Sequence, residues 1–138
     1  MTQEQKDLLL NDLGSRLPYG VKIAMPGLWD NSRITIDPLE EIFKGDDGLF
    51  RVNGNGHCIE YIKPYLFPMS SMTDEDYAMY FKIWEDTGKK AYLDGCHHLI
   101  TNIKAYKAAN DYLLSKHYDI NGLIPMGLAI DATNKNIY

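Results

Sequence analysis

The sequence contains little positive charge. Lysine and arginine together number 14 against 19 aspartate and glutamate residues, so the formal net charge is -5. Only three arginines occur, and Lys89-Lys90 is the densest basic pair. Non-specific nucleic-acid binding depends on clustered lysine and arginine contacts to phosphates. The composition therefore argues against a nucleic-acid partner.

Cysteines and long apolar runs are also scarce. The two cysteines, Cys58 and Cys96, cannot build a disulfide framework. No apolar run approaches the roughly 20 residues that a membrane-spanning helix needs, and the first residues show no signal-peptide pattern. We therefore expect a soluble, cytoplasmic protein without a membrane anchor.

Cofactor motifs are missing as well. Gly54 and Gly56 are spaced like the first two glycines of a dinucleotide-binding loop, but Ile59 occupies the place of the third. No phosphate-binding G-x-x-x-x-G-K motif occurs, and the acidic stretch from Asp37 to Asp47 lacks the ligand spacing of a calcium loop. We expect no cofactor and interpret the acidic stretch as a solvated edge.

What the sequence does contain is enough apolar material for one core. Of 138 residues, 45% are hydrophobic and 12% aromatic, which is sufficient for a globular domain. No linker, repeat or low-complexity stretch divides the chain. We expect a single domain over residues 1–138.

The first half of the chain has the pattern of a helix followed by two β-hairpins. Thr2 and Gln5 have the spacing of a capping box, and leucines recur at helical intervals, which predicts a helix from about Gln3 to Arg16. Alternating or apolar segments bounded by turn residues predict paired strands. These segments are residues 21–25, 33–37, 49–52 and 57–62.

The segment from Asp37 to Lys44 fits two structures. Asp37 as an N-cap followed by Pro38 favours a short helix, whereas the apolar residues before the next glycine-rich turn equally fit a strand. We favour the strand, because the Asn-Gly pairs further along are a strong hairpin signal.

The chain changes from β-rich to helical after Ile62. Pro64 and Pro68 fix φ and remove two backbone donors, so we expect the residues between them to leave the sheet instead of lying in a central strand. Thr73 is a good N-cap, and the apolar spacing beyond it predicts a helix that ends at Gly88.

A second long helix is predicted from about His97 to His117, after a short connection over Lys89–Asp94. The apolar tail from Leu123 to Asp131 is interrupted by proline and glycine, so we expect it to pack as a strap across the domain. The predicted fold is α+β, with a small antiparallel sheet of four or five strands packed by an N-terminal helix and two longer C-terminal helices. The strand order stays open.

Two segments carry a resemblance to a known family. IKPYLFPMSSMT (Ile62–Thr73) and HYDINGLIPMGLAID (His117–Asp131) resemble segments of small uncharacterised proteins of Bacteroidales bacteria and of their phages or prophages. The resemblance implies the same order of an N-terminal helix, a β section, a hinge and a terminal GLI-x-x-GLA segment. It implies no catalytic residues, and Phe67 stands where such relatives carry arginine.

The densest chemical cluster is Asp94-Gly95-Cys96-His97-His98. If Asp94 caps the following helix, the Cys96 thiol lies in its first turn, where the helix dipole and a neighbouring imidazolium favour a reactive thiolate. His97 or His98 would then be the base of a small thiol-dependent enzyme. Because adjacent helix residues project in different directions, the alternative is a structural thiol beside two surface imidazoles.

A zinc site is a second interpretation of the same residues. Cys96 and His98 could combine across space with His57 and Cys58 to supply thiolate and imidazole ligands. In a strand, however, His57 and Cys58 point to opposite faces, so only one of them can be a ligand. The sequence therefore does not establish a metal site.

Aromatic residues supply the binding candidates. The chain has ten tyrosines, and aromatic side chains suit both a core and a recognition surface. Trp29 lies at the tip of the first hairpin, where it can pack back onto the core, the alternative we favour, or contact a partner. Tyr65 and Phe67 lie between two prolines, where we expect them to be accessible. Tyr77 and Tyr80 share a helical stripe with other apolar residues, so we assign them to the core.

The leading functional hypothesis is a non-enzymatic interaction protein. It would be an accessory factor of phage or mobile-element origin that binds a protein partner through its acidic surface and aromatic hinge. This hypothesis rests on the lack of a complete catalytic motif and on the family resemblance. The alternative is the thiol- or metal-dependent enzyme described above.

Overall fold

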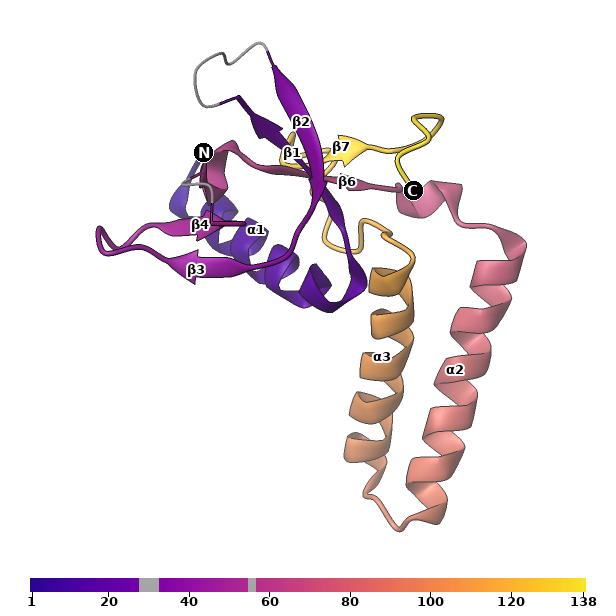
Figure 1. Ribbon diagram of the computed structural model, residues 1–138. Coiled ribbons are helices and arrows are strands. Elements are labelled where there is room, and N and C mark those ends of the chain that lie inside the picture. The colour runs from indigo at the N-terminus through magenta and orange to yellow at the C-terminus, as the bar shows by residue number, and fades with distance from the viewer. Residues whose placement is uncertain (28–32, 55–56) are drawn as a thin grey trace.

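The computed structural model describes residues 1–27, 33–54 and 57–138, and it confirms the predicted α+β architecture. Figure 1 shows a mixed body from which two helices project. The helices are α1 (Gln3–Arg16), α2 (Asp74–Leu93) and α3 (His98–Ser115). The strands are β1 (Lys22–Pro26), β2 (Ile34–Pro38), β3 (Ile42–Lys44), β4 (Phe50–Val52), β5 (His57–Cys58), β6 (Lys63–Leu66) and β7 (Ile130–Asp131). Short 3-10 turns cover Leu17–Tyr19, Ile59–Tyr61 and Met69–Ser71.

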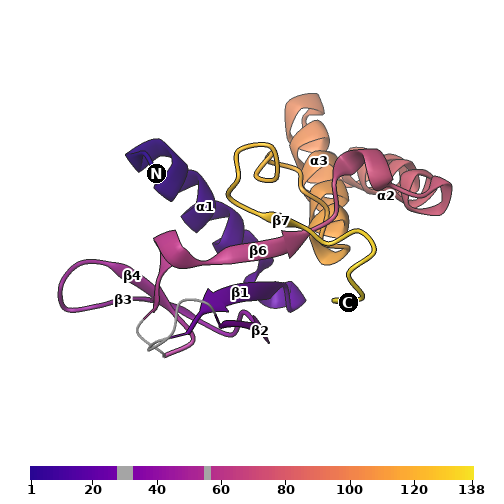
Figure 2. The ribbon, with the colours of Figure 1, turned by 90° about the horizontal axis from the view of Figure 1, so that it is seen from above.

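A four-stranded sheet with strand order β2-β1-β6-β7 forms the centre of the body. β1 pairs antiparallel with both neighbours, so that Ile23 lies between Asp37 and Pro64. β7 runs parallel to β6, with Tyr65 opposite Ile130. A smaller antiparallel sheet, β3-β4-β5, extends to one side (Figure 2). The predicted strands therefore divide between two sheets.

β6 corrects the prediction that the segment between the hinge prolines leaves the sheet. It is an inner strand with β1 on one side and β7 on the other. Pro64 is tolerated because β7 pairs only with Tyr65 and Leu66, so the missing donor precedes that pairing. The amide of Phe67 then donates to the carbonyl of His117 at 2.9 Å, which ties the hinge to the end of α3.

The segment from Asp37 to Lys44 is extended, as the hairpin signal favoured. β2 ends at Pro38, and β3 covers the last three residues of this segment. Between them, the Asn53 side chain accepts from the amide of Glu40 at 2.8 Å and donates to the carbonyl of Pro38 at 2.9 Å. These bonds satisfy the backbone groups that a helix would otherwise use, so no helix forms here.

α1 supplies one side of the main core. The predicted capping box is confirmed, because the Thr2 hydroxyl accepts from the Gln5 amide and the Gln5 side chain accepts from the Thr2 amide. Leucines of α1 then pack against the sheet and the tail. The fully buried members of this core include Leu9, Leu13, Val21, Ile23, Val52, Ile62, Leu66 and Leu123.

A buried ion pair lies inside this otherwise apolar core. Arg16 Nε donates to Asp12 Oδ2 at 2.7 Å, and both side chains are fully buried. Arg16 Nη2 also donates to the carbonyl of Tyr118 at 2.8 Å, and the side-chain nitrogen Nδ2 of Asn121 donates to Asp12 Oδ1 at 2.8 Å. The pair therefore joins α1 to the segment that follows α3.

The helix boundaries differ from the prediction at one end. Thr73 is the N-cap of α2, as predicted, and its hydroxyl accepts from the Asp76 amide. The helix does not end at Gly88 but continues to Leu93. Of the predicted connection over residues 89–94, residues 89–93 are therefore helical and Asp94 is the C-cap. Gly88 lies in the contact with α3, where a residue without a side chain lets the two helices approach closely.

The tail packs across the domain, as predicted. β7 pairs with β6, and the Tyr138 hydroxyl donates to the Tyr65 carbonyl at 2.6 Å and accepts from the Lys22 amide at 2.9 Å. The Tyr138 ring stacks on His117, with centroids 3.8 Å apart. Burial, together with the positive charges of Arg16, Lys116 and Lys22, lowers the pKa of His117 from 6.5 to about 4.

Gly88→Ala should stabilise the protein. An added methyl would lie 3.9 Å from the Ala105 Cβ, an ordinary contact, and alanine loses less conformational entropy in a helix. We expect the free energy of unfolding to rise by about 0.5–1 kcal/mol in denaturant titrations. Gly95→Ala is the control: at φ +82° it should lower stability. Equal effects of the two changes would contradict the packing described here.

Asp12→Ala should destabilise strongly, because it leaves the buried Arg16 charge without its carboxylate. Removing one partner of a buried pair costs about 3–5 kcal/mol. Denaturant unfolding should show this loss, whereas Asp7→Ala on the exposed side of the same helix should change stability little. Similar losses in the two variants would show that the buried pair has no special role.

Stability should fall as the pH is lowered from about 6.5 to about 4. The native state keeps His117 neutral to about pH 4, whereas the unfolded chain binds a proton near its ordinary value of 6.5. Protons therefore favour the unfolded state in this window. Asparagine tolerates the native φ of 65° at this position. In denaturant titrations, the free energy of unfolding of His117→Asn should therefore depend less steeply on pH than that of the wild type. Parallel curves for the two proteins would refute the assignment.

Candidate protein-interaction surface on the α2–α3 arm

α2 and α3 form an antiparallel pair, here called the arm, that extends away from the sheets (Figure 1). Small side chains line the contact between the two helices. Ala91 of α2 and Ala105 and Ala109 of α3 are buried there, and Gly88 faces Ala105. Because small residues allow close approach, the backbones of the two helices can pack closely along this line.

A carboxylate fixes the base of the arm. Asp76, in the first turn of α2, accepts hydrogen bonds from the Tyr118 hydroxyl at 2.6 Å and from the Tyr112 hydroxyl at 2.7 Å. Tyr112 belongs to α3 and Tyr118 to the segment beyond it. One carboxylate therefore ties both ends of the arm together where they meet the body.

The pKa values of these groups reflect their hydrogen bonds and burial. Donation by the Tyr118 and Tyr112 hydroxyls holds the pKa of Asp76 below its usual range. Burial, followed by the hydrogen bond to Asp76, raises the pKa of Tyr112 to about 12 and also raises that of Tyr118. At neutral pH the site is thus a carboxylate held by two neutral phenols, which together form a structural joint.

Aromatic side chains gather on one face of the arm. The Phe81 ring lies edge-on against the rings of Tyr77 and Tyr80, with centroids 4.9 and 5.6 Å apart. Trp84 of α2 contacts Tyr106 of α3 in the same manner at 6.1 Å. These rings run along the outside of the helix pair, so we call this side of the arm the aromatic face.

α3 extends the aromatic face toward the tip. Leu99, Ile103 and Tyr106 are exposed and follow one another at intervals of four and three residues, which places them on one side of the helix. This stripe is separate from the alanine stripe that packs on α2. α3 therefore has two apolar sides, of which the arm itself uses one.

A groove marks the base of the aromatic face. Its volume is about 290 Å³, and it receives side chains from the hinge, both helices and the segment after α3. The lining residues include Met69, Met72, Tyr77, Tyr80, Tyr106 and Leu113. An apolar groove of this kind can receive a projecting apolar side chain of a partner.

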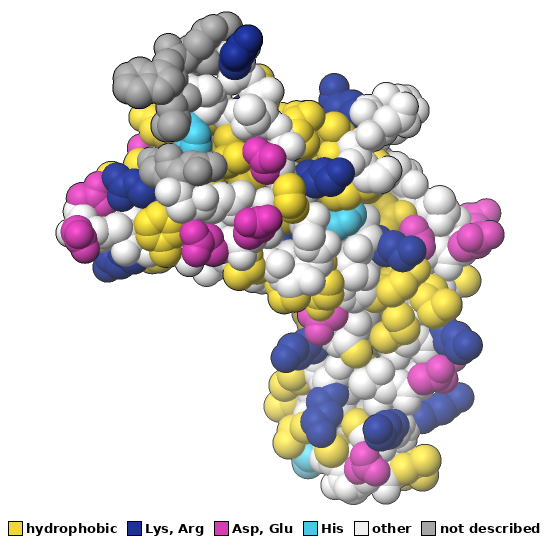
Figure 3. Space-filling model, viewed as in Figure 1, with side chains coloured by type: hydrophobic (Ala, Val, Ile, Leu, Met, Phe, Trp, Pro, Cys, Tyr) yellow, Lys and Arg dark blue, Asp and Glu magenta, His cyan; other side chains and the backbone are white. Residues whose placement is uncertain are grey.

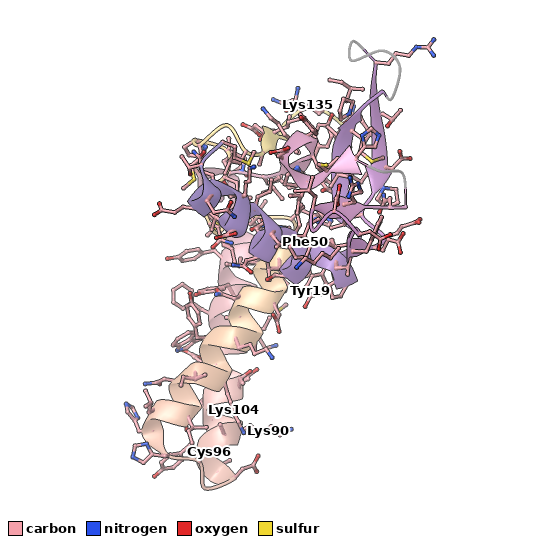
Figure 4. The ribbon with its side chains drawn as sticks, turned by 90° about the vertical axis from the view of Figure 1, so that its left-hand side faces the viewer. Tyr19, Phe50, Lys90, Cys96, Lys104 and Lys135 are labelled. Atoms are coloured by element: carbon pink, nitrogen blue, oxygen red, sulfur yellow. The ribbon has the colours of Figure 1, made fainter. Side chains whose placement is uncertain are left out.

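The opposite side of the arm carries charge. Lys90 and Lys104 lie together near the tip, with Cys96 beside them, while aromatic rings project from the other side (Figure 4). Lys104 Nζ lies 3.5 Å from the Cys96 sulfur. Apolar side chains occur along the arm from its junction with the body to its tip (Figure 3). The arm therefore has an apolar and a charged face.

The tip of the arm contains the predicted cysteine–histidine cluster. Asp94 ends α2, and His97, not Asp94, is the N-cap of α3, with Nδ1 accepting from the Leu99 amide at 3.3 Å. The His98 imidazole contacts the Asn102 side chain at 3.3 Å. In the described part of the chain, no hydrogen bond joins Cys96 to either imidazole. The roles proposed for Cys96, His97 and His98 in catalysis remain predictions.

The predicted zinc ligands lie in two distant places. His57 and Cys58 form β5, which pairs with β4 in the small sheet of the body, whereas Cys96 and His98 lie where α2 meets α3 at the far tip of the arm (Figure 1). Within residues 1–27, 33–54 and 57–138, no three histidine, cysteine or acidic side chains gather to hold a metal ion. The structure does not bring the four candidates together.

The predicted aromatic contacts have different outcomes. Trp29 lies outside the described residues. Tyr65 is only 7% exposed, so its predicted accessibility is wrong: it is covered by β7 and the tail. Phe67 is half-buried against Tyr118 and Tyr138. A binding role for these residues remains a prediction.

The assignment of Tyr77 and Tyr80 to the core is also corrected. Tyr77 is 56% exposed, and Tyr80 is half-buried in the groove. Both lie on a two-helix layer that no third layer covers in the described part of the chain. The helical stripe was correctly recognised, but it faces outward.

Sequence reasoning missed the exposed residues of α3. No motif singles out Leu99, Ile103 or Tyr106 in the sequence, because helical spacing marks an apolar side without showing whether the chain covers it. One pattern in the sequence could have indicated them: apolar residues occur on two sides of this helix, with alanines on one side and larger side chains on the other. A helix with a surplus apolar side indicates a second contact.

Comparison of the chain with protein-family models, with curated proteins and with solved structures found no match. In the ranges that the structure describes, no helix is long and apolar enough to cross a membrane. The functional argument therefore depends on the surface of the arm.

Proposed function

We propose that the protein is a non-enzymatic interaction protein whose α2–α3 arm binds a protein partner through the aromatic face. The observation that supports this is the exposure of large apolar side chains along the arm. Phe81 of α2 and Ile103 of α3 are 46% and 58% exposed, and both belong to the aromatic face, where several large apolar side chains lie together. The arm thus presents apolar surface that the chain itself leaves open.

The amount of this surface supports the proposal. Nine large apolar side chains of the two helices are exposed: Tyr77, Met79, Phe81, Tyr92, Leu93, Leu99, Ile100, Ile103 and Tyr106. Monomeric proteins rarely expose contiguous apolar patches above a few hundred Å². Five of the nine, Tyr77, Phe81, Leu99, Ile103 and Tyr106, lie on the aromatic face, and side chains of this size and exposure leave on the order of 500 Å² open there, near the upper end for a monomer.

The residue types fit a protein partner. Tyrosine, phenylalanine, tryptophan and methionine are enriched in the centres of protein interfaces, because they bury large areas at a modest cost in side-chain entropy. The groove beside Tyr77 and Tyr106 provides a pocket for an apolar anchor. The partner should therefore present an apolar helix or a set of projecting apolar side chains.

The family resemblance supports an accessory role of phage or mobile-element origin in Bacteroidales. It is carried by the hinge and by the segment after α3, and these two segments hold the base of the arm through Tyr118 and Phe67. The formal net charge of -5 does not favour a nucleic-acid partner.

A matched pair of variants tests the proposal. Phe81→Gln with Ile103→Gln removes two exposed side chains from the aromatic face, whereas Lys90→Gln with Lys104→Gln makes an equal number of changes on the charged face. Because the substituted side chains are largely exposed, both variants should keep the wild-type melting temperature within a few degrees.

Tagged protein expressed in a Bacteroidales host should be cross-linked, captured and compared across the three forms by mass spectrometry. We expect at least one partner that the wild type and the lysine variant retain and that the aromatic-face variant loses at least tenfold. If every captured protein is retained equally by both variants, the aromatic face is not the binding surface.

A further inference from the structure

β2 is an open edge of the central sheet. It is the terminal strand in the order β2-β1-β6-β7, and all of its residues are exposed. Ile34 and Ile36 are 61% and 45% exposed, although isoleucine is among the residues most often buried. In the described part of the chain, β1 is its one pairing partner.

The hydrogen bonds to β1 determine which groups of β2 point outward. The Leu39 amide donates to the Val21 carbonyl at 2.8 Å, and the Gly27 amide donates to the Arg33 carbonyl at 2.6 Å. Backbone groups alternate in direction along a strand, so those of residues 33, 35 and 37 face β1. The amides and carbonyls of Ile34 and Ile36 therefore face the open edge.

We propose that β2 pairs antiparallel with β2 of a second copy of this chain, about a two-fold axis at Thr35. In this register Ile34 of each copy lies opposite Ile36 of the other. These are the residues whose amides and carbonyls face outward, so each pair exchanges two hydrogen bonds as an antiparallel ladder requires. Thr35 lies opposite its own counterpart on the axis.

The same register pairs opposite charges. Arg33 of each copy lies opposite Asp37 of the other, and both side chains are exposed. Each Arg33–Asp37 pair is a non-hydrogen-bonded pair of the ladder, the type in which the two side chains lie closest together. Opposite charges placed directly across a ladder stabilise the pairing, and like charges would oppose it. The strand is thus complementary to itself, which favours a second copy over an unrelated extended peptide.

The pairing would also cover an apolar surface. Ile34 and Ile36 lie on one face of the sheet, where Ile34, Tyr61 and Ile130 border an open pocket of about 290 Å³. Across the two-fold axis the isoleucines of both copies form one continuous cluster. Such isologous contacts, in which the same patch occurs on both partners, are the commonest way in which proteins dimerise.

Natural proteins usually protect open edges with lysine, a bulge or a central proline. Between Ile34 and Asp37 the strand contains none of these, and Pro38 occupies only its last position. The outward amides are therefore available along the part of the strand that the proposed register uses.

Charge reversal tests the register. Dissociation constants would be measured by sedimentation for the wild type, for Arg33→Asp, for Asp37→Arg and for the double variant. Each single change places like charges opposite each other, whereas the double change restores opposite pairs. We expect the single variants to dimerise at least tenfold more weakly and the double variant to return to within about threefold of the wild type. All four proteins should keep the wild-type circular dichroism spectrum.

A cysteine variant tests the axis directly. Thr35→Cys would place two thiols on the two-fold axis, where Cα atoms about 4.5 Å apart lie within the range for a disulfide. Mild oxidation should therefore cross-link it rapidly. Asp37→Cys, displaced from the axis, should cross-link no faster than the wild type with its own Cys58 and Cys96.

A monomeric wild type at all accessible concentrations would overturn the proposal, as would a dimer that does not respond to the charge changes. The aromatic-face variant Phe81→Gln with Ile103→Gln should dimerise like the wild type. If that variant alone loses dimerisation, the arm and not β2 forms the contact between copies. The two surfaces are therefore tested separately.

Discussion

The structure depends on one buried charge. Arg16 is fully buried, so its guanidinium must find acceptors inside the protein. Asp12 supplies a carboxylate and Tyr118 a carbonyl, and the Tyr118 hydroxyl continues the chain of hydrogen bonds to Asp76 at the start of α2. α1, the segment after α3 and the base of the arm are therefore positioned relative to one another by polar bonds of defined direction, which apolar packing alone would not provide.

This arrangement separates the apolar core from the exposed apolar surface of the arm. The apolar core lies between α1, the central sheet and the tail, whereas the arm contributes mainly small side chains to its own helix contact. The large apolar side chains of the arm are consequently not needed to hold the body together. The arm can carry an apolar outer face because its base is fixed by Asp76 and its two phenol donors.

Local signals in the sequence were sufficient for the caps and for most helices and strands. The capping residues Thr2 and Thr73 depend only on neighbours three residues away, and both were predicted.

Features that depend on residues far along the chain were not predicted. β6 became an inner strand because β7, far along the chain, pairs with it. Asp12 and Arg16 share the helical stripe of Leu9 and Leu13, and the sequence alone does not reveal that such a charged pair is buried. The candidate site was missed for a related reason: a periodic stripe shows that a face is apolar, but not whether the chain covers it.

The hinge contact between Phe67 and Tyr118 has a consequence for how the chain folds. These residues flank the whole arm, and they lie side by side as neighbours in a parallel bridge. Bringing them together through a flexible loop would cost closure entropy that grows with loop length. A helical hairpin has mainly local contacts and forms quickly, and once formed it holds its two ends at this separation. A formed arm therefore keeps the two segments that flank it close together, which lowers the entropy cost of pairing β7 with β6.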